Sequence, residues 1–137
     1  MSTSINTKII TRLLIANRGE IAIRIMQSAQ KLGIHCIALY SEADRNALHV
    51  KKADEAWFIG PSPAKESYLV VEKILEVAKN SNADAVHPGY GFLSENAEFA
   101  QAIMDAGMAW VGPPVGAIQA MGSKIESKKL MEAANVP

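Results

Sequence analysis

Two short segments of the sequence combine glycine with side chains that could contact a ligand. They are Asn17-Arg-Gly-Glu20 and His87-Pro-Gly-Tyr-Gly-Phe92. Glycine lets the backbone take positive φ and approach a ligand closely, whereas arginine, glutamate and histidine can bind charged groups or transfer protons. Each segment follows a short apolar run, the pattern of a buried strand. These two segments are therefore the first candidates for a ligand-binding site.

Arg18 and Glu20 flank the start of a helix that the sequence predicts from Glu20 onward. Their favoured interpretation is a local salt bridge, with the Glu20 carboxylate near the positive end of the helix dipole. The alternative is direct contact between these side chains and a substrate.

The segment Gly89-Tyr-Gly-Phe-Leu-Ser94 partly matches the glycine fingerprint of dinucleotide-binding proteins, since it follows a strand and precedes a helix. Three features argue against NAD binding. The third position is serine, the loop follows the fourth strand instead of the first, and Trp110-Val-Gly112 stands where an acid should meet the ribose. We instead expect the glycines to supply positive φ, and Ser94 to cap a helix at Glu95 or Asn96.

His87 is interpreted as a hydrogen-bonded structural histidine in preference to a catalytic base. No second histidine or cysteine lies at the spacing of metal ligands, so no metal site is expected. The only cysteine, Cys36, lies among Ile34, Ile37 and Leu39 and is expected to be a core residue and not a reactive thiol. A single cysteine cannot form an internal disulfide, which favours a reducing compartment.

A third candidate segment is Met121-Gly-Ser-Lys-Ile-Glu126. Ser123 and Glu126 fit the capping box, so a helix is expected to start at Lys124. A glycine, a helix start and a lysine could together receive phosphate oxygens. The spacing does not match a P-loop, however, because no glycine occupies position 117. From these residues alone, a solvated lysine is favoured over a ligand.

Short apolar runs alternate with helical periodicity along the chain, and these elements must position the candidate segments. Strands are expected at 13–16, 35–40, 56–59, 83–87 and 109–111, and helices at 20–32, 69–78 and 97–106, with another helix opened by Gly112-Pro-Pro114. This alternation predicts an α/β, Rossmann-like fold: a parallel five-stranded sheet with helices on both faces and strand order 3-2-1-4-5. Ligands bind such sheets where the strand order reverses, between the first and fourth strands, and that is where the first two candidate segments should meet.

The composition restricts the class of protein. The 137 residues include 14 basic and 14 acidic side chains, which gives a formal net charge of zero. Balanced charge argues against nucleic acid or an anionic membrane as the main partner, and no run of about 18 apolar residues could span a membrane. Together with a polar start that is no signal peptide, this predicts a cytoplasmic protein.

The expected organisation is a polar N-terminal extension at 1–11, one Rossmann-like domain at 12–122, and a helix at 123–137. That last helix should end just before Pro137, with nothing to close it. The sequence is therefore expected to be part of something longer.

Several segments together resemble the N-terminal domain of biotin carboxylases. They are Leu14–Arg24, Tyr40–Asp44, His49–Val50 with Ala53–Glu55, and His87–Asn96, and Met121–Lys124 continues the match with serine where aspartate is commoner. The similarity runs from Arg12 to Pro137. The segment Ser41–His49 looks most like the biotin-carrying α subunits of acyl-CoA carboxylases, of the methylcrotonyl, propionyl or acetyl type.

The resemblance implies a Rossmann-like domain of the pre-ATP-grasp type, followed by an ATP-grasp fold. Members of the family use MgATP to activate bicarbonate, as carboxyphosphate, and transfer the carboxyl group to N1′ of biotin as the first half-reaction of an acyl-CoA carboxylase. The resemblance implies that Lys124 is an ATP ligand and that Tyr90 and Gly91 face biotin and bicarbonate. It leaves His87 and Arg18 as structural residues. The implied cofactors are ATP, Mg²⁺ and carried biotin.

The resemblance also implies that the metal-binding acids, the bicarbonate-binding lysine and arginine, and the general base lie further along the chain. No catalytic residue and no metal ligand is therefore expected here, and this fragment alone is expected to be inactive. The implied partners are the ATP-grasp domains of the same enzyme, a biotin carboxyl carrier domain and a carboxyltransferase subunit. Gln27 and Lys31 stand where free-standing bacterial members place an arginine and a glutamate for their dimer contact, which argues against that dimer.

Two functions of other classes compete with this one. The first is a non-catalytic nucleotide-binding or scaffolding module of the same fold, because a fold alone does not fix function. The second is a nicotinamide-binding oxidoreductase domain.

Overall fold

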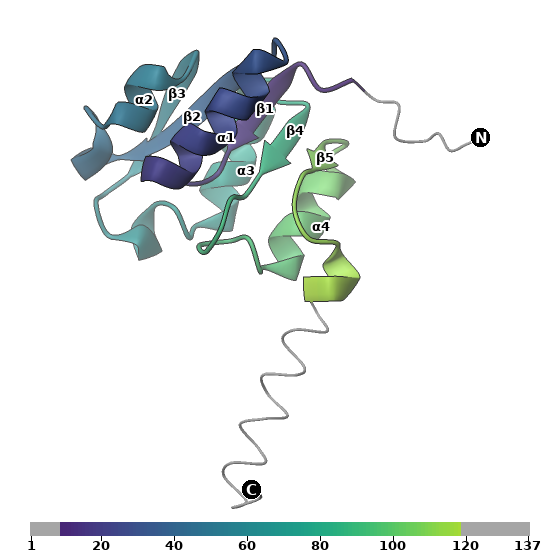
Figure 1. The fold of residues 1–137 in the computed structure, drawn as a ribbon. Coiled ribbons are helices and arrows are strands. Elements are labelled where there is room, and N and C mark those ends of the chain that lie inside the picture. Colours follow the sequence, from purple (N-terminus) through teal and green to yellow (C-terminus); the bar gives the residue numbers. More distant parts are fainter. Residues whose placement is uncertain (1–8, 119–137) are drawn as a thin grey trace, which may run out of the picture.

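A computed structural model describes residues 9–118, which form a sheet with helices on both faces (Figure 1). The strands are β1 (Arg12–Ile15), β2 (His35–Ser41), β3 (Glu55–Gly60), β4 (Ala85–His87) and β5 (Ala109–Trp110). Each pair of neighbouring strands is parallel, and the order is β3-β2-β1-β4-β5. The predicted Rossmann-like sheet and its strand order are confirmed.

The helices α1 (Gly19–Lys31), α2 (Leu48–Lys52), α3 (Val71–Asn80) and α4 (Ala97–Asp105) connect the strands, and short 3-10 turns lie at Glu42–Asp44 and Ala64–Glu66. Successive strand side chains point to opposite faces of the sheet. In β1, Leu13 therefore packs with Met26 of α1, whereas Leu14 packs with Ile74 of α3 and Phe99 of α4. Because both faces are covered in this way, the three buried residues of this strand, Leu13, Leu14 and Ile15, are all apolar.

Among residues 9–118, no helix covers the α1 side of β4 and β5 (Figure 1). The chain runs through α1 and α2 toward β3, and then returns through α3 and α4 in the opposite direction across the sheet. Right-handed crossovers in opposite directions place their helices on opposite faces. A groove of about 550 Å³ remains beside α1, where Leu13, His87, Tyr90 and Val111 are among the lining residues.

Local details of the chain explain the boundaries of several elements. Gly33 has φ +79° just behind α1, as expected for a C-terminal cap. Strand β4 is shorter than the predicted 83–87, because the Ala83 N–H bonds to the Ala78 carbonyl at the end of α3. Cys36 is fully buried in the cluster under α1, which confirms its assignment to the core. Residues 115–118 are helical, as predicted after Gly112-Pro-Pro114.

Ser94 does not cap α4, which corrects the prediction made from the sequence. The N-cap residue is Asn96, whose Oδ1 accepts a hydrogen bond from the Phe99 N–H at 2.9 Å. Two successive turns precede it, the first closed by the Ser94 N–H donating to the Gly91 carbonyl at 2.9 Å. These turns delay the start of the helix to Ala97.

Candidate functional site

The loops that follow β1 and β4 meet at the carboxyl edge of the sheet and are joined by Asn17. This side chain is 2% exposed, and its amide donates to the carbonyls of Pro88 at 2.9 Å and Tyr90 at 2.7 Å. Its Oδ1 accepts from the Arg18 N–H at 2.9 Å. One buried amide therefore ties the first loop to the second.

Gly89 is required by both its conformation and its surroundings. Its φ is +67°, and a Cβ at this position would lie 2.6 Å from Asn17 Nδ2. A side chain here would displace the amide that joins the two loops. The expectation that Gly89 and Gly91 supply positive φ is confirmed, because Gly91 has φ +71°.

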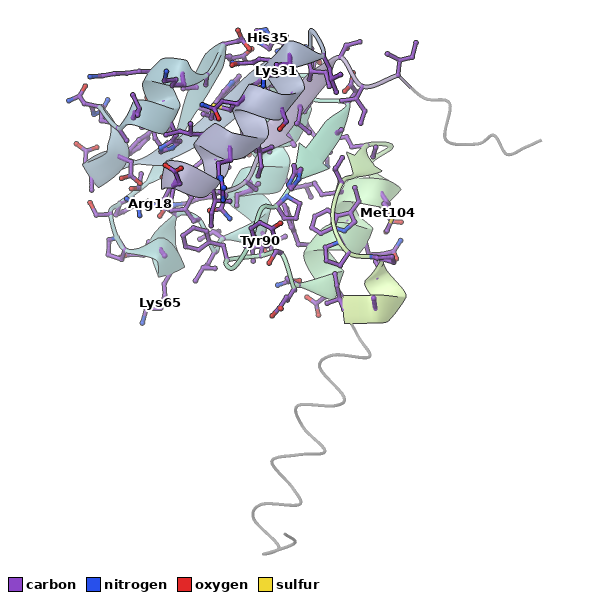
Figure 2. All side chains as sticks on the ribbon, in the orientation of Figure 1. Arg18, Lys31, His35, Lys65, Tyr90 and Met104 are labelled. Atoms are coloured by element: carbon purple, nitrogen blue, oxygen red, sulfur yellow. The ribbon has the colours of Figure 1, made fainter. Side chains whose placement is uncertain are left out.

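The two loops enclose a hollow of about 400 Å³, which is lined by residues 17–21 and 90–92. A Cβ at Gly91 would meet no atom within 4 Å, so the loop leaves open space at this position. The Tyr90 side chain is 76% exposed. Figure 2 shows Tyr90 and Arg18 near each other at this edge of the molecule. The structure thus brings Arg18, Glu20, Tyr90 and Gly91 to one hollow, as the predicted strand order requires.

The expected salt bridge between Arg18 and Glu20 is wrong, because Arg18 pairs with Asp44. The Arg18 Nε and a terminal nitrogen each donate to a carboxylate oxygen of Asp44 at 2.6 Å. These bonds, and a further one from Tyr68, hold the pKa of Asp44 down at about 2. The carboxylate in turn raises the pKa of Arg18. Sequence reasoning missed Asp44, although an acid just behind a strand end, beside the reversal of strand order, is a signal that could have identified it.

Asp44 also joins a third segment to the site. Tyr68 is 2% exposed, and its hydroxyl donates to Asp44 Oδ2 at 2.6 Å and accepts from the Ser41 N–H at 3.2 Å. The Tyr68 ring stacks on Phe92, with centroids 5.2 Å apart and planes inclined by 17°. Phe92 lines the hollow, so Tyr68 reaches the site through Phe92.

Two histidines near the site have structural hydrogen bonds. His87 Nδ1 accepts from the Gly89 N–H at 3.0 Å, and burial lowers the pKa of His87. The hydrogen bond expected for a structural His87 is therefore present. His49 is 1% exposed, with Nε2 2.9 Å from the Leu39 carbonyl and Nδ1 3.4 Å from the Gly19 N–H. These partners assign it the neutral tautomer with the proton on Nε2.

Some sequence-based expectations concern residues for which the structure gives no description. Lys124 and the Ser123–Glu126 capping box lie outside the described residues. Within residues 9–118, no group of three or more histidine, cysteine, aspartate or glutamate side chains could hold a metal ion. None of the helices in this part of the chain has the length and apolar character needed to cross a membrane.

Comparisons with known proteins agree on one family. The family described as "Biotin carboxylase, N-terminal domain" matches residues 9–118. The mitochondrial methylcrotonoyl-CoA carboxylase subunit alpha of Mus musculus is 58% identical over 128 residues, which are 93% of this chain and 18% of that protein. The biotin carboxylase of Halalkalibacterium halodurans is 57% identical over 126 residues, which are 92% of this chain and 28% of that protein.

A solved structure shows the same fold. It is the biotin carboxylase domain of a thermophilic 2-oxoglutarate carboxylase bound to bicarbonate, with a TM-score of 0.82, 44% identity, and coverage of 95% of this chain and 29% of that one. This chain therefore spans less than a third of each of these three proteins. The sequence match and the shared strand order together show that the chain belongs to the family of biotin carboxylase N-terminal domains.

Proposed function

We propose that the protein containing this chain is an ATP-dependent biotin carboxylase, and that it serves an acyl-CoA carboxylase. It uses MgATP to activate bicarbonate and transfers the carboxyl group to biotin, in the first half-reaction of the acyl-CoA carboxylase. The observation that carries the proposal is the joining of two glycine loops around one hollow, in a chain of the biotin carboxylase family.

The role we propose for this domain is to bind and orient the biotin end of the substrate. Gly91 leaves space for close approach, and Tyr90 presents an exposed ring beside it, suited to packing against an apolar bicyclic group. Arg18 is neutralised by Asp44, so we assign it a structural role and not direct contact with bicarbonate. The support from relatives is that one similar solved structure is described as bound to bicarbonate.

The proposed ATP contact of this chain is Lys124, whose ammonium group would stabilise the phosphate oxygens. Residues 9–118 offer no set of metal ligands, so we assign the Mg²⁺ that accompanies ATP to residues elsewhere in the protein. The proposed partners are the ATP-grasp domains of the same protein, a biotin carboxyl carrier domain and a carboxyltransferase subunit. The length of the relatives, of which this chain covers 18% to 28%, leaves room for such domains.

We also propose a cytoplasmic location. Cys36 is a buried free thiol, which suits a reducing compartment. Because one relative carries "mitochondrial" in its name, the competing location is the mitochondrion. Cell fractionation with an antibody to this domain distinguishes the two.

The experiment that tests the proposed function compares Gly91→Val with Gly33→Val in the full polypeptide. Both glycines have positive φ, +71° and +79°, and open space at the Cβ, so the two variants carry matched backbone strain. Incorporation of radiolabelled bicarbonate into biotin is measured together with ATP hydrolysis. We expect Gly91→Val to lower carboxylation about tenfold or more with little change in the KM for ATP, because valine fills the space proposed for biotin.

Gly33→Val, at the far end of α1, should stay close to the wild-type rate. Absence of biotin- and bicarbonate-dependent ATP hydrolysis in the wild type would overturn the proposed function. Equal losses in both variants, with equally lowered melting temperatures, would show that the Gly91 loop has a structural role only.

A further inference from the structure

Phe92 is held in a conformation that large side chains rarely adopt. Its φ is +46°, in the left-handed region, where a bulky residue is strained and depends on its surroundings. Those surroundings include the stacked Tyr68 ring, which is almost fully buried. Because Phe92 lines the hollow beside Gly91, the position of Tyr68 determines where this end of the loop lies.

Tyr68 is itself fixed at its hydroxyl. That group donates to Asp44 at 2.6 Å and accepts from the Ser41 backbone at 3.2 Å, so it is bound on both sides. Burial and the neighbouring carboxylate raise the pKa of Tyr68 to about 12, which keeps the hydroxyl protonated as a donor at any assay pH. The hydroxyl cannot move away from this position without breaking one of these bonds.

Asp44 then connects Tyr68 to the opposite loop. Its two oxygens accept two bonds from Arg18, which lies directly before Gly19 at the start of α1. The contacts thus run from Arg18 through Asp44 and Tyr68 to Phe92. The two end residues line the hollow, whereas Asp44 and Tyr68 do not.

We propose that Asp44 and Tyr68 are positioning residues that hold the two loops of the site at a fixed separation. Asn17 joins the loops at their bases, near the sheet, and the Asp44–Tyr68 pair joins them at a second point. Two separated attachments fix the orientation of a loop, whereas one leaves it free to rotate. The expected effect of these residues on biotin carboxylation rests on the proposed function. Their expected effect on the order of the loop does not depend on it.

The first test measures amide hydrogen exchange by NMR in this chain. Two loop amides report on the loop: Gly89 N–H, bonded to His87, and Ser94 N–H, bonded to Gly91. The Ala16 N–H, bonded to the His87 carbonyl, reports on the sheet. In Tyr68→Leu we expect about tenfold faster exchange at the loop amides than in the wild type, with a much smaller change at Ala16.

The matched control is Tyr40→Leu. Tyr40 also pairs with an aromatic ring, Phe58, at 5.7 Å, and it carries the Arg45 guanidinium over its face. Its substitution should leave the loop amides unchanged. If Tyr68→Leu does not fold, Tyr68→Phe takes its place, because it keeps the ring and removes only the hydroxyl. The proposal is overturned if loop and sheet amides accelerate equally, or if the loop amides do not respond.

The second test measures steady-state kinetics in the full polypeptide. Tyr68→Phe should raise the KM for biotin about threefold and leave the KM for ATP unchanged, because a slightly misplaced loop weakens only the contacts it makes. A loss of stability alone would lower the apparent kcat and leave the KM values for biotin and for ATP unchanged, and that result would overturn the positioning role. If the wild type shows no biotin- and bicarbonate-dependent ATP hydrolysis, the proposed function fails while the exchange result stands. If Gly91→Val acts and Tyr68→Phe does not, the positioning role fails alone.

Discussion

The carboxylate of Asp44 is the most highly connected polar group described near the site. Its pKa of about 2 in the folded chain lies below the ordinary value of 3.8, because Arg18 and Tyr68 donate to the ionised form. A lowered folded pKa adds stability that is complete above the ordinary value and is lost as the pH falls through 3.8 toward 2.

Asp44→Asn should therefore lower the free energy of unfolding by about 2 kcal/mol at neutral pH, because it removes charge-assisted hydrogen bonds from Arg18, whose side chain stays half exposed to water. Urea unfolding at neutral pH and near pH 3 measures the effect, and the gap between variant and wild type should narrow in acid. The control is Glu42→Gln, which removes the exposed ion pair with Arg45 and should cost little. A gap that is constant with pH would contradict an ionic role for Asp44.

A second prediction for a single residue concerns the contribution of Lys124 to ATP binding. In the full polypeptide, Lys124→Gln removes a charge-assisted hydrogen bond worth about 1.5–3 kcal/mol, so ATP affinity should fall about tenfold to a hundredfold. Lys124→Arg keeps the charge but changes the donor geometry, and should restore the affinity only partly. ATP titration measures both variants. Thermal melts should coincide with those of the wild type, because position 124 needs only a good helix former. Unchanged ATP affinity in Lys124→Gln would show that this lysine is a solvated side chain and not an ATP ligand.

Among the secondary-structure elements, helix α4 offers a test of which residue caps its N-terminus, Asn96 or Ser94. Asn96 accepts the Phe99 N–H, so Asn96→Ala should lower the free energy of unfolding by about 1 kcal/mol. Ser94→Ala should cost less than about 0.5 kcal/mol, because its side chain makes no capping bond to this helix. Denaturant unfolding of both variants checks the order, and a larger loss in Ser94→Ala would contradict the capping geometry.

For the whole molecule, we predict that this chain folds by itself and does not turn over. Its sheet has one apolar cluster on each face, which provides a core without metal or disulfide. Circular dichroism should show a cooperative thermal transition, while bicarbonate-dependent ATP hydrolysis stays at background. A biotin-stimulated rate that disappears in Lys124→Gln would contradict the prediction.

The charged groups also predict how the whole fold responds to acid. Glu55 accepts bonds from Trp57, His35 and Arg12, which lower its pKa from 4.5 to about 2. Together with Asp44, it should make the chain lose stability as the pH falls from about 4.5 toward 2. Urea midpoints across this range measure the loss, which should be smaller in Glu55→Gln than in the wild type. Midpoints that do not change with pH would contradict this account.

The amino-acid sequence is sufficient to predict the strand order and the meeting of the loops after β1 and β4. Periodicity identifies strands and helices locally, and the right-handed crossover rule leaves few ways to arrange them. The sequence also predicts the positive φ of Gly89 and Gly91 and the burial of Cys36, since a tight loop and the apolar run Cys36–Leu39 are local patterns. The family resemblance rested on these loops together with segments at 40–55 and 121–124, and the family match over residues 9–118 confirmed it.

The side chains that hold those loops in place become visible only in the folded chain. Arg18 forms its ion pair with Asp44, which lies 26 residues away in the sequence, and not with Glu20. Asp44 in turn bonds to Tyr68, which lies 24 residues further along. The spacing of residues within one segment cannot predict such pairs. They form because crossovers of different length bring distant segments of the chain to one edge of the sheet. The cap of α4 differs from these pairs, because two local turns, closed by Ser94 to Gly91 and Asn96 to Leu93, delay the start of the helix to Ala97. Local pattern fixes the elements and their order, whereas contacts between distant segments exist only after the sheet has assembled.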